Sequence, residues 1–591
     1  MIVKNMSFTN HLRPLLLAII QLSSLGVFTC HVYAQSDLNQ IEQQQYNQYQ
    51  QRLDNLEDET SKPFVRLSEP TPDTSLKEPP LGESPCFNIY QVNLQLPDEP
   101  TLKKQFATIL GPIKYGQGSI LGHCIGQQGL NYALRNVQNE LIKQGFITSQ
   151  ATIEPQDLTN GVLNITIIPG RFHKVWRSED GHPKTNISNA LTLSEGDLIN
   201  LREIETSLEN FRLPQSAITN IDIIPSINAV DNEQYGSSDL VVAQKRPTPI
   251  QWQLSIDDSG NKDTGKYQGT VTTSIDNPLS ANDALSLSYT HSIGPWNDTD
   301  QLSNNNSLYV NYRYPYKKWQ LQLLYSDYDF NQTLAGLNQN IVYKGKSNQS
   351  SVGLQRLIHR DRYSKTSASL EGYHKNSKNY FDDQEIEVQR RRTSGWKAGI
   401  EHQRQTPLGD MTASLQYQKG TGALSAINAP ESYISEAASQ PSIWNAQVSL
   451  RHPFNVDKSS YQYTFQWRGQ YSPQLLIPQD RFSIGGRYTT KGLSDEQSLS
   501  GENGMLLQQE VARIVPLTGQ VTLMPYVTLD QGWVSGDSTQ YLAGNYLMST
   551  SIGARLYANN ISIDGFIGRG LQAPRSIDKD TTGGFRVTIY N

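Results

Sequence analysis

The chain has 591 residues, enough for several domains, and its formal net charge of −6 argues against a general nucleic-acid-binding protein. Its mean hydropathy is −0.53, and no run of about twenty apolar residues follows the N-terminal segment, so we expect no transmembrane helix in the mature protein. The 30 tyrosines outnumber the 15 phenylalanines, and tyrosine is favoured in strands and at membrane–water interfaces.

Residues 1–34 have the pattern of a secretory signal peptide. Lys4 and Arg13 supply positive charge before and within an apolar stretch, and the small residue Ala34 ends a cleavage site. Cys30 leaves with this segment. A lipoprotein signal at Cys30 is the weaker alternative, because no small residue stands just before that cysteine.

Two cysteines, Cys86 and Cys124, remain after cleavage. A secreted chain enters a compartment that permits disulfide bonds, so we predict a bond between them. Two free thiols are the alternative.

Residues 35–58 are rich in glutamine, contain neither glycine nor proline, and predict a helix. Its apolar face is thin and consists of Leu38, Ile41, Leu53 and Leu56. A helix that is polar nearly all round needs a wet or polar environment. Residues 59–85 contain six prolines, which indicates a linker.

Residues 86–169 predict a compact α+β module with the order β-α-α-β-β. Its second helix carries apolar residues on one face from Leu130 to Leu141 and ends at Gly145. Residues 170–247 repeat the same order. Two similar modules of about 80 residues in series predict a tandem array.

From about residue 250 to the C-terminus, helical periodicity gives way to alternation of apolar and polar residues. We count roughly sixteen strands there, each about nine to eleven residues long, which is enough to cross a membrane when tilted. A soluble sandwich also alternates. Aromatic residues near the strand ends and a polar opposite face favour a membrane barrel, which must close because lipid satisfies no backbone group.

A glycine-rich connection interrupts this barrel at Phe482–Leu493 and carries a cation, Lys491, beside Gly492. About forty residues later, the carboxylate of Asp530 lies in a strand whose apolar face includes Val527 and Leu529. The alternation therefore places Asp530 inside the barrel. From the residues alone, a solvated carboxylate with a mobile lysine is the simpler interpretation, and a loop cation that meets this wall carboxylate is the other.

These segments, in this order, resemble the outer-membrane transporters of two-partner secretion over essentially the whole mature chain. The resemblance is carried in the first module by Pro85–Ile89, Gly122–Gly129, Leu141–Ile147, Pro155–Asp157 and Ile168–Arg171, and in the barrel by Gln479–Tyr488, Ser498–Gly501 and Pro525–Asp530. It implies α+β polypeptide-transport-associated (POTRA) domains in the periplasm at 86–169 and 170–247, followed by an all-β, 16-stranded outer-membrane barrel at 248–591.

The resemblance also implies site roles. The 35–58 helix lies in the lumen as a plug, and a loop at about 472–503 folds into the barrel and contacts its wall. The loop-tip roles pass to Arg487, Lys491, Gly492 and Leu493, with Asp530 as the wall partner.

Three positions depart from the family pattern. Lys491 stands where the family has arginine and therefore lacks the bidentate fork, while Leu493 stands where an aromatic residue is usual. The chain ends in Asn591, where such barrels usually end in an aromatic residue, and the neighbouring Tyr590 is a candidate substitute.

The implied function is export of a large exoprotein that is captured unfolded and in extended form by the POTRA domains. The cargo is a haemolysin, an adhesin or a contact-dependent inhibition toxin. Outer-membrane lipid, the barrel-assembly machinery and periplasmic chaperones are the other expected partners, and we expect a functional monomer. Addition of a cargo strand to a POTRA sheet edge is a plausible mode of capture.

The sequence shows no nucleotide-binding motif, no metal-ligand cluster and no catalytic spacing, so we predict neither an enzyme nor a cofactor or metal site. A barrel-assembly factor is one alternative, but such proteins carry more POTRA modules. A porin-like channel is another, but it has no need of such modules. An outer-membrane hydrolase is the third, and no site supports it.

Overall fold

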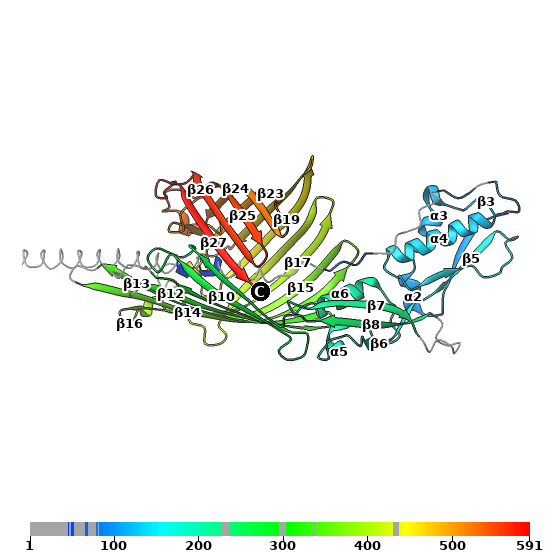
Figure 1. The fold of residues 1–591 in the computed structure, drawn as a ribbon, viewed down its shortest axis with the longest axis horizontal. Helices are drawn as coiled ribbons and strands as arrows, with labels where there is room; N and C mark the ends of the chain where they lie inside the picture. Colours follow the sequence, from blue (N-terminus) through cyan, green and yellow to red (C-terminus); the bar gives the residue numbers. More distant parts are fainter. Residues whose placement is uncertain are drawn as a thin grey trace, which may run out of the picture.

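The computed structural model describes residues 45–46, 49–51, 65–68, 78–80, 82–226, 236–294, 303–335, 339–429 and 437–591. The molecule is elongated, with two α+β modules at one end and a large β-barrel at the other (Figure 1). Within the described residues, no helix is both long enough and apolar enough to cross a membrane.

The first module packs helices on a three-stranded sheet. The sheet order is β2 (Gln91–Gln95), β5 (Val162–Ile168) and β4 (Gln150–Thr152), and β1 (Phe87–Asn88) pairs separately with β3 (Cys124–Ile125). The helices are α2 (Pro100–Gln105), α3 (Gly111–Lys114) and α4 (Gln127–Lys143). The predicted β-α-α-β-β order is present, but the first predicted helix is divided into α2 and α3. Pro112 lies in the first turn of α3, where its missing N–H costs no helical hydrogen bond.

The second module repeats this arrangement. Its sheet has the order β6 (Arg171–Arg177), β8 (Ser237–Lys245) and β7 (Ile218–Pro225), and its helices are α5 (Ile187–Ala190) and α6 (Leu201–Phe211). Asn200 caps α6 by accepting a hydrogen bond from the backbone N–H of Arg202. Ile204, Leu208 and Phe211 of α6 are buried in the core of the module.

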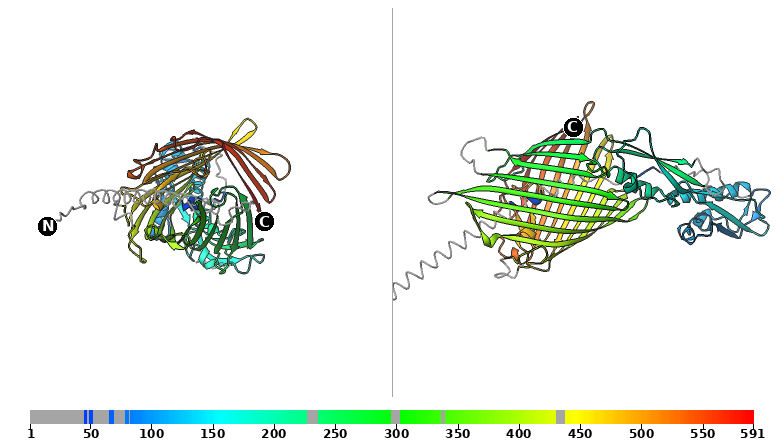
Figure 2. Two further views of the ribbon diagram at one scale, coloured as in Figure 1. Left: turned by 90° about the vertical axis from the view of Figure 1, so that its left-hand side faces the viewer. Right: turned by 90° about the horizontal axis from the view of Figure 1, so that it is seen from below.

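The barrel contains sixteen long strands in the described part of the chain, paired antiparallel from β9 round to β27 and back to β9 (Figure 2). They are β9 (Ile250–Asp257), β10 (Gln268–Asp276), β11 (Ala284–Ser292), β12 (Asn304–Tyr316), β13 (Trp319–Ala335), β14 (Asn340–Arg360), β15 (Ser364–Phe381), β17 (Arg391–Thr406), β18 (Gly409–Thr421), β19 (Ser442–Val456), β20 (Ser459–Tyr471), β23 (Asn503–Pro516), β24 (Val521–Ser535), β25 (Tyr546–Ala558), β26 (Ile561–Gln572) and β27 (Thr582–Tyr590). A two-residue strand, β16 (Gln384–Glu385), pairs antiparallel with the end of β15.

Alternation along the strands separates an apolar outer face from a polar inner one. On β13, Leu323 and Tyr325 are exposed on the outside, while Gln320 and Gln322 line a lumen space of about 740 Å³. The strands are 8 to 21 residues long, so many exceed the predicted nine to eleven. The same alternation continues beyond the length that a bilayer requires.

The C-terminus closes the barrel. Asn591 donates its backbone N–H to the carbonyl of Trp252, and its side-chain oxygen accepts from the backbone N–H of Trp252 at 2.8 Å. The polar terminal residue thus binds the first strand, while the Tyr590 hydroxyl donates to the carbonyl of Asn559.

Candidate functional site

The connection between β20 and β23 folds inward and brings its tip to the barrel wall. It contains a short hairpin, β21 (Phe482–Ile484) paired with β22 (Leu499–Gly501). Gly485 and Gly486 follow β21 with φ of 130° and 85°, a region that favours glycine. Their conformation turns the chain so that residues 487–493 reach the inner face of β24, β25 and β26.

The main chain of the tip binds two polar side chains of the wall. The backbone N–H of Lys491 donates to Asp530 Oδ2 at 3.0 Å, and the backbone N–H of Gly492 donates to Ser549 Oγ at 3.2 Å. Asp530 is 2% exposed, so the inward direction deduced from strand alternation agrees with its position in the structure. A carboxylate that accepts a backbone N–H in a buried setting makes a strong, directional contact.

The ammonium of Lys491 takes a different partner from the one that the sequence indicated. Lys491 Nζ donates to the Tyr526 hydroxyl at 3.2 Å and lies 4.7 Å from the Tyr526 ring centre and 5.0 Å from that of Phe566. The predicted contact between residues 491 and 530 is therefore made by the amide rather than by the cation. The tip lies so close to the wall that its backbone reaches Asp530, and the side chain extends past it over the two rings.

Tyr526 also contacts a charged network of the wall. The guanidinium of Arg555 lies 4.2 Å from the ring centre and binds both carboxylate oxygens of Glu510, at 2.6 and 2.7 Å. The Tyr526 hydroxyl donates to Asp564 Oδ1 at 2.8 Å. Sequence reasoning missed these residues. Tyr526 has the same strand parity as Asp530, which indicates an inward side chain but does not single it out as the partner of Lys491.

Glycine is required where the tip contacts the wall. A Cβ added to Gly492 would lie 2.6 Å from the carbonyl oxygen of Thr550 and 2.7 Å from the backbone N and O of Arg569. A Cβ added to the wall residue Gly568 would lie 2.6 Å from the Cα of Gly492. Two glycines therefore face each other at the closest approach.

Arg487 and Leu493 fix the two ends of the tip. The Arg487 guanidinium donates to Asp258, and its backbone N–H donates to Asp495 Oδ1 at 2.6 Å. Leu493 is 2% exposed. It belongs to an apolar cluster with Ile484, Leu499, Leu506, Val534, Leu547 and Ile577. Where the family has an aromatic residue, Leu493 therefore packs among aliphatic side chains.

Helical residues of the N-terminal segment lie inside the barrel. Tyr49 is 5% exposed and stacks on Tyr328 with ring centres 4.5 Å apart, and Gln45 accepts a 2.9 Å hydrogen bond from the Tyr328 hydroxyl. Tyr46 lies near Lys375 of the wall, which is 3.9 Å from Asp480 at the base of the inward loop.

The predicted apolar positions Leu38, Ile41, Leu53 and Leu56 lie outside the described residues. The described contacts of the helix are made by tyrosine and glutamine instead. The repeated Gln and Tyr residues of 43–51 were visible in the sequence, but their spacing did not show which face would meet the wall.

The end of the linker is fixed to the first module. Cys86 and Cys124 form a disulfide bond with Cα atoms 5.3 Å apart. The carboxylate of Glu83 accepts backbone hydrogen bonds from Gly126, Gln128 and Gly129 at the N-terminus of α4. Local desolvation acts to raise the pKa of Glu83, but these three N–H groups outweigh it and lower the pKa below its usual value.

The first module also offers an open groove. Strand β2 forms the edge of its sheet in the described residues, and a groove of about 1480 Å³ lies between β2 and helices α2 and α3. Leu94 and Tyr115 line it, and Tyr115 is 76% exposed. An open strand edge beside an apolar groove fits an extended peptide.

In the described residues, no group of three or more His, Cys, Asp or Glu side chains is arranged to hold a metal ion. The chemistry that this arrangement supports is the binding and guidance of a polypeptide. The features that favour it are the polar lumen, the inward loop, the helical residues in the pore and the groove of the first module.

Comparison with known proteins also indicates a protein that transports polypeptides. Residues 236–556, more than half of the chain, match the family described as haemolysin secretion/activation protein ShlB/FhaC/HecB, and residues 115–170 match the ShlB-type POTRA domain. The outer membrane transporter CdiB-2 of Burkholderia pseudomallei is 27% identical over 87% of each chain. The hemolysin transporter protein ShlB of Serratia marcescens is 25% identical over 72% of this chain and 74% of its own.

Among solved structures, CdiB from Acinetobacter baumannii is 33% identical, with a TM-score of 0.77 over 92% of this chain and 98% of that one. CdiB from Escherichia coli shares the fold, with 23% identity and a TM-score of 0.80 over 93% and 99%. The chain therefore belongs to the haemolysin secretion/activation (ShlB/FhaC/HecB) family, the outer-membrane transporters of two-partner secretion, and its POTRA end lies in the periplasm.

Proposed function

We propose that this transporter captures one large exoprotein in extended form at its periplasmic modules and passes it through the barrel lumen to the cell surface. The open edge of β2 and the groove beside it carry the proposal, because they offer main-chain hydrogen bonds and apolar contacts to an unfolded chain. The periplasm supplies no nucleotide energy in this scheme, so folding of the cargo outside gives the direction. A catalytic activity is no part of it.

The proposal also assigns a role to each segment of the chain. Residues 1–34 are the signal peptide, 35–58 the plug helix and 59–85 the linker, while 86–169 and 170–247 are the two POTRA domains and 248–591 the barrel. The loop at about 472–503 controls passage through contacts of Arg487, Lys491, Gly492 and Leu493 with the wall, including Asp530. Assembly depends on the barrel-assembly machinery and periplasmic chaperones, and the transporter works as a monomer.

The names of the relatives narrow the class of cargo but do not identify one cargo. Several relatives are named CdiB, and others are hemolysin transporters, so a contact-dependent inhibition toxin, a haemolysin and an adhesin remain candidates. A very large neighbouring reading frame with β-helical repeats would identify the cargo. Deletion of the transporter gene should then remove that one protein from the cell surface or medium, and its continued export would contradict the proposal.

The capture site can be tested directly. A photo-crosslinking residue in place of Tyr115, which lines the groove, should capture the cargo during export. The matched control is Tyr90, which is 70% exposed on the same module but does not line the groove. Equal capture at both positions would mean that the groove is not the binding site.

A further inference from the structure

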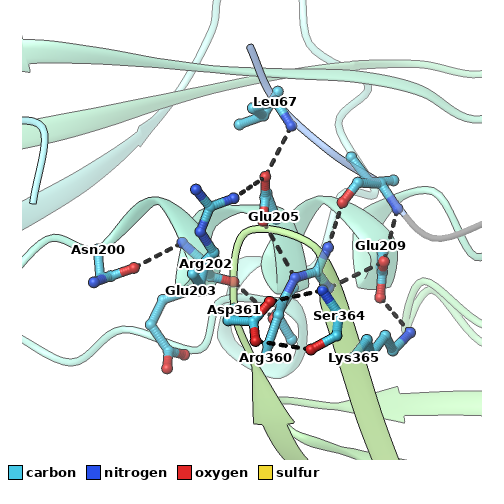
Figure 3. Close-up of polar contacts among 12 residues, drawn as sticks. Leu67, Asn200, Arg202, Glu203, Glu205, Glu209, Arg360, Asp361, Ser364 and Lys365 are labelled. Carbon is cyan, nitrogen blue, oxygen red and sulfur yellow. Dashed lines mark hydrogen bonds and ion pairs between the residues drawn. The ribbon is translucent and has the colours of Figure 1, made fainter. Parts of the chain in front are cut away.

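The linker segment 65–68 lies between α6 of the second module and the β14–β15 turn of the barrel (Figure 3). The backbone N–H of Val65 donates to Glu209 Oε1 at 2.8 Å, and that of Leu67 donates to Glu205 Oε1 at 2.9 Å. The segment therefore runs antiparallel to α6 and is held by two carboxylates one helical turn apart.

The spacing of these partners is that of an extended chain. Alternate residues of an extended chain are about 6.6 Å apart. Residues four apart on a helix are separated by about 6 Å along its axis. Glu205 and Glu209 therefore match every second N–H of an extended segment, whatever its side chains are.

Arg360, at the end of β14, completes the site from the barrel side. It donates to the carbonyl oxygen of Val65 and pairs with Glu205 at 3.2 Å and with Glu209 at 3.0 Å. The side chains of Arg360 and Glu205 are 3% and 1% exposed, so the charges are buried against each other. Lys365 of β15 donates to Glu209 at 2.7 Å. The site thus offers acceptors for backbone N–H and a donor for backbone C=O.

The side chains of the segment follow a simple pattern. Val65 and Leu67 pack against the core of the second module, while Arg66 and Ser68 are exposed. Arg66 donates to Gln405 at 2.7 Å and lies 5.1 Å from the ring centre of Tyr363. Exposed contacts of this kind contribute little to binding. Recognition therefore depends on extended geometry and on apolar residues at alternate positions.

We propose that α6 and the β14–β15 turn form a receptor site for extended polypeptide with apolar residues at alternate positions, in which residues 65–68 are the resting occupant and an unfolded segment of the cargo is the competitor. The proposal rests on the function proposed above, because that function supplies such a segment at the periplasmic end of the barrel. Displacement of residues 65–68 frees the linker that leads to the helical residues in the pore. Cargo arrival and release of the plug helix are thereby the same event.

The resting state favours the linker because it is tethered. A segment of the same chain binds intramolecularly, and its effective concentration can reach the millimolar range. A cargo segment must therefore be held nearby, for example by the first module, before it competes. This requirement prevents the pore from opening in response to dilute peptides.

The test uses the full-length transporter in detergent and a fluorescent peptide with the sequence of residues 63–70. Val65→Asp together with Leu67→Asp in the transporter removes the resting occupant without altering α6 or the turn. We expect the peptide to bind this variant at least ten-fold more tightly than it binds the wild type, as measured by fluorescence anisotropy. Equal binding to both proteins, or no binding to the variant, would overturn the proposal. Slower migration of the unheated barrel in SDS gels would reveal misfolding.

Peptide variants separate the two kinds of recognition. The peptide with Arg66→Ala should retain its affinity, while the peptide with Val65→Asp and Leu67→Asp should lose it. An unrelated peptide with Val or Leu at alternate positions should also bind, and exclusive binding of the native sequence would contradict a receptor for cargo. If the peptides bind but gene deletion leaves export intact, the proposed function fails while the receptor site stands. If the peptides do not bind but gene deletion abolishes export, the receptor site is wrong and the proposed function stands.

Discussion

The tip of the inward loop divides its contacts between main chain and side chain. Asp530 accepts the amide of Lys491, and the ammonium of the same residue lies over Tyr526 and Phe566. Any residue except proline supplies that amide, so Asp530 alone does not require a cation at this position. The rings of Tyr526 and Phe566 favour a cation at this position, because an aromatic face attracts a positive charge.

Lys491→Met should therefore weaken the seating of the loop while leaving the amide contact in place. A desolvated cation–π contact contributes about 2 kcal/mol or more, and the methionine still fills the space. We expect several-fold lower export and faster proteolysis of the loop in intact cells. Lys491→Arg keeps a charge over the rings and should retain most export. Equal loss in both variants would show that shape, rather than charge, matters at the tip.

Gly492 and Gly568 allow the closest approach between loop and wall. Gly492→Ala and Gly568→Ala should each destabilise the seated loop by about 1–3 kcal/mol, since the added methyl meets backbone atoms that have little room to move. Loop accessibility to a protease measures the effect. Gly565→Ala is the matched control on the same strand, because a Cβ there meets no atom within 4 Å. A change in Gly565→Ala as large as in Gly568→Ala would contradict the steric argument.

From the sequence, the position of the contact between the loop tip and the wall was easier to predict than the groups that form it. Strand alternation shows which residues face inward, so the inward side chain of Asp530 follows from parity. Whether its partner is an amide or an ammonium depends on how closely the loop approaches the wall, which is a tertiary distance. Tyr526 shared the parity of Asp530, but no local pattern distinguishes a ring that receives a cation from one that merely lines the lumen.

At the scale of elements, helix α6 joins the second module to the barrel through two kinds of ion pair, one buried and one exposed. Arg360 pairs with Glu205 where both side chains are nearly inaccessible, whereas Lys318 pairs with Glu203 where they are 45% and 29% exposed. Buried and exposed ion pairs behave differently when one partner is removed. The two pairs lie on the same helix and provide a direct comparison.

Arg360→Ala should loosen the module from the barrel. Removal of one partner from a buried pair costs about 3–5 kcal/mol at most, and Lys365 and Arg202 retain part of the interaction here. Lys318→Ala should cost about 0–1 kcal/mol. The distance distribution between spin labels on α6 and on the barrel should broaden only in Arg360→Ala. Broadening of the same extent in Lys318→Ala would show that the interface depends on net charge rather than on the buried pair.

The elements themselves were largely predictable because each has a local cause. Period-two alternation gave the barrel strands, and the apolar face from Leu130 to Leu141 gave α4. Strand lengths were underestimated, since alternation carries no information about where the bilayer ends. The division of α2 from α3 follows from Pro112, which begins a new helical turn. The receptor site on α6 could not be predicted, because its three parts are far apart in the sequence.

At the scale of the whole molecule, the barrel lumen holds two inserted segments that meet the wall in different ways. The loop tip meets β24 to β26 through main-chain contacts and buried charges. Of the described helical residues, Tyr49 stacks on Tyr328, Gln45 forms polar contacts with Thr264 and Tyr328, and Tyr46 lies near Lys375. In the plug role proposed above, these contacts break before cargo enters.

The stack of Tyr49 on Tyr328 gives a graded test of the plug. Aromatic pairs contribute about 0.5–1.5 kcal/mol beyond the area they bury, so Tyr49→Ala should raise the open probability of the channel roughly two- to ten-fold in planar bilayers. Deletion of residues 36–58 should have a larger effect than Tyr49→Ala. It should raise the conductance of the channel above the wild-type value, because the helix is then absent from the lumen. Tyr90→Ala, on the first module, should leave conductance unchanged. If the deletion leaves conductance at the wild-type value, the helix does not restrict the pore, and the ring pair serves only to hold it in place.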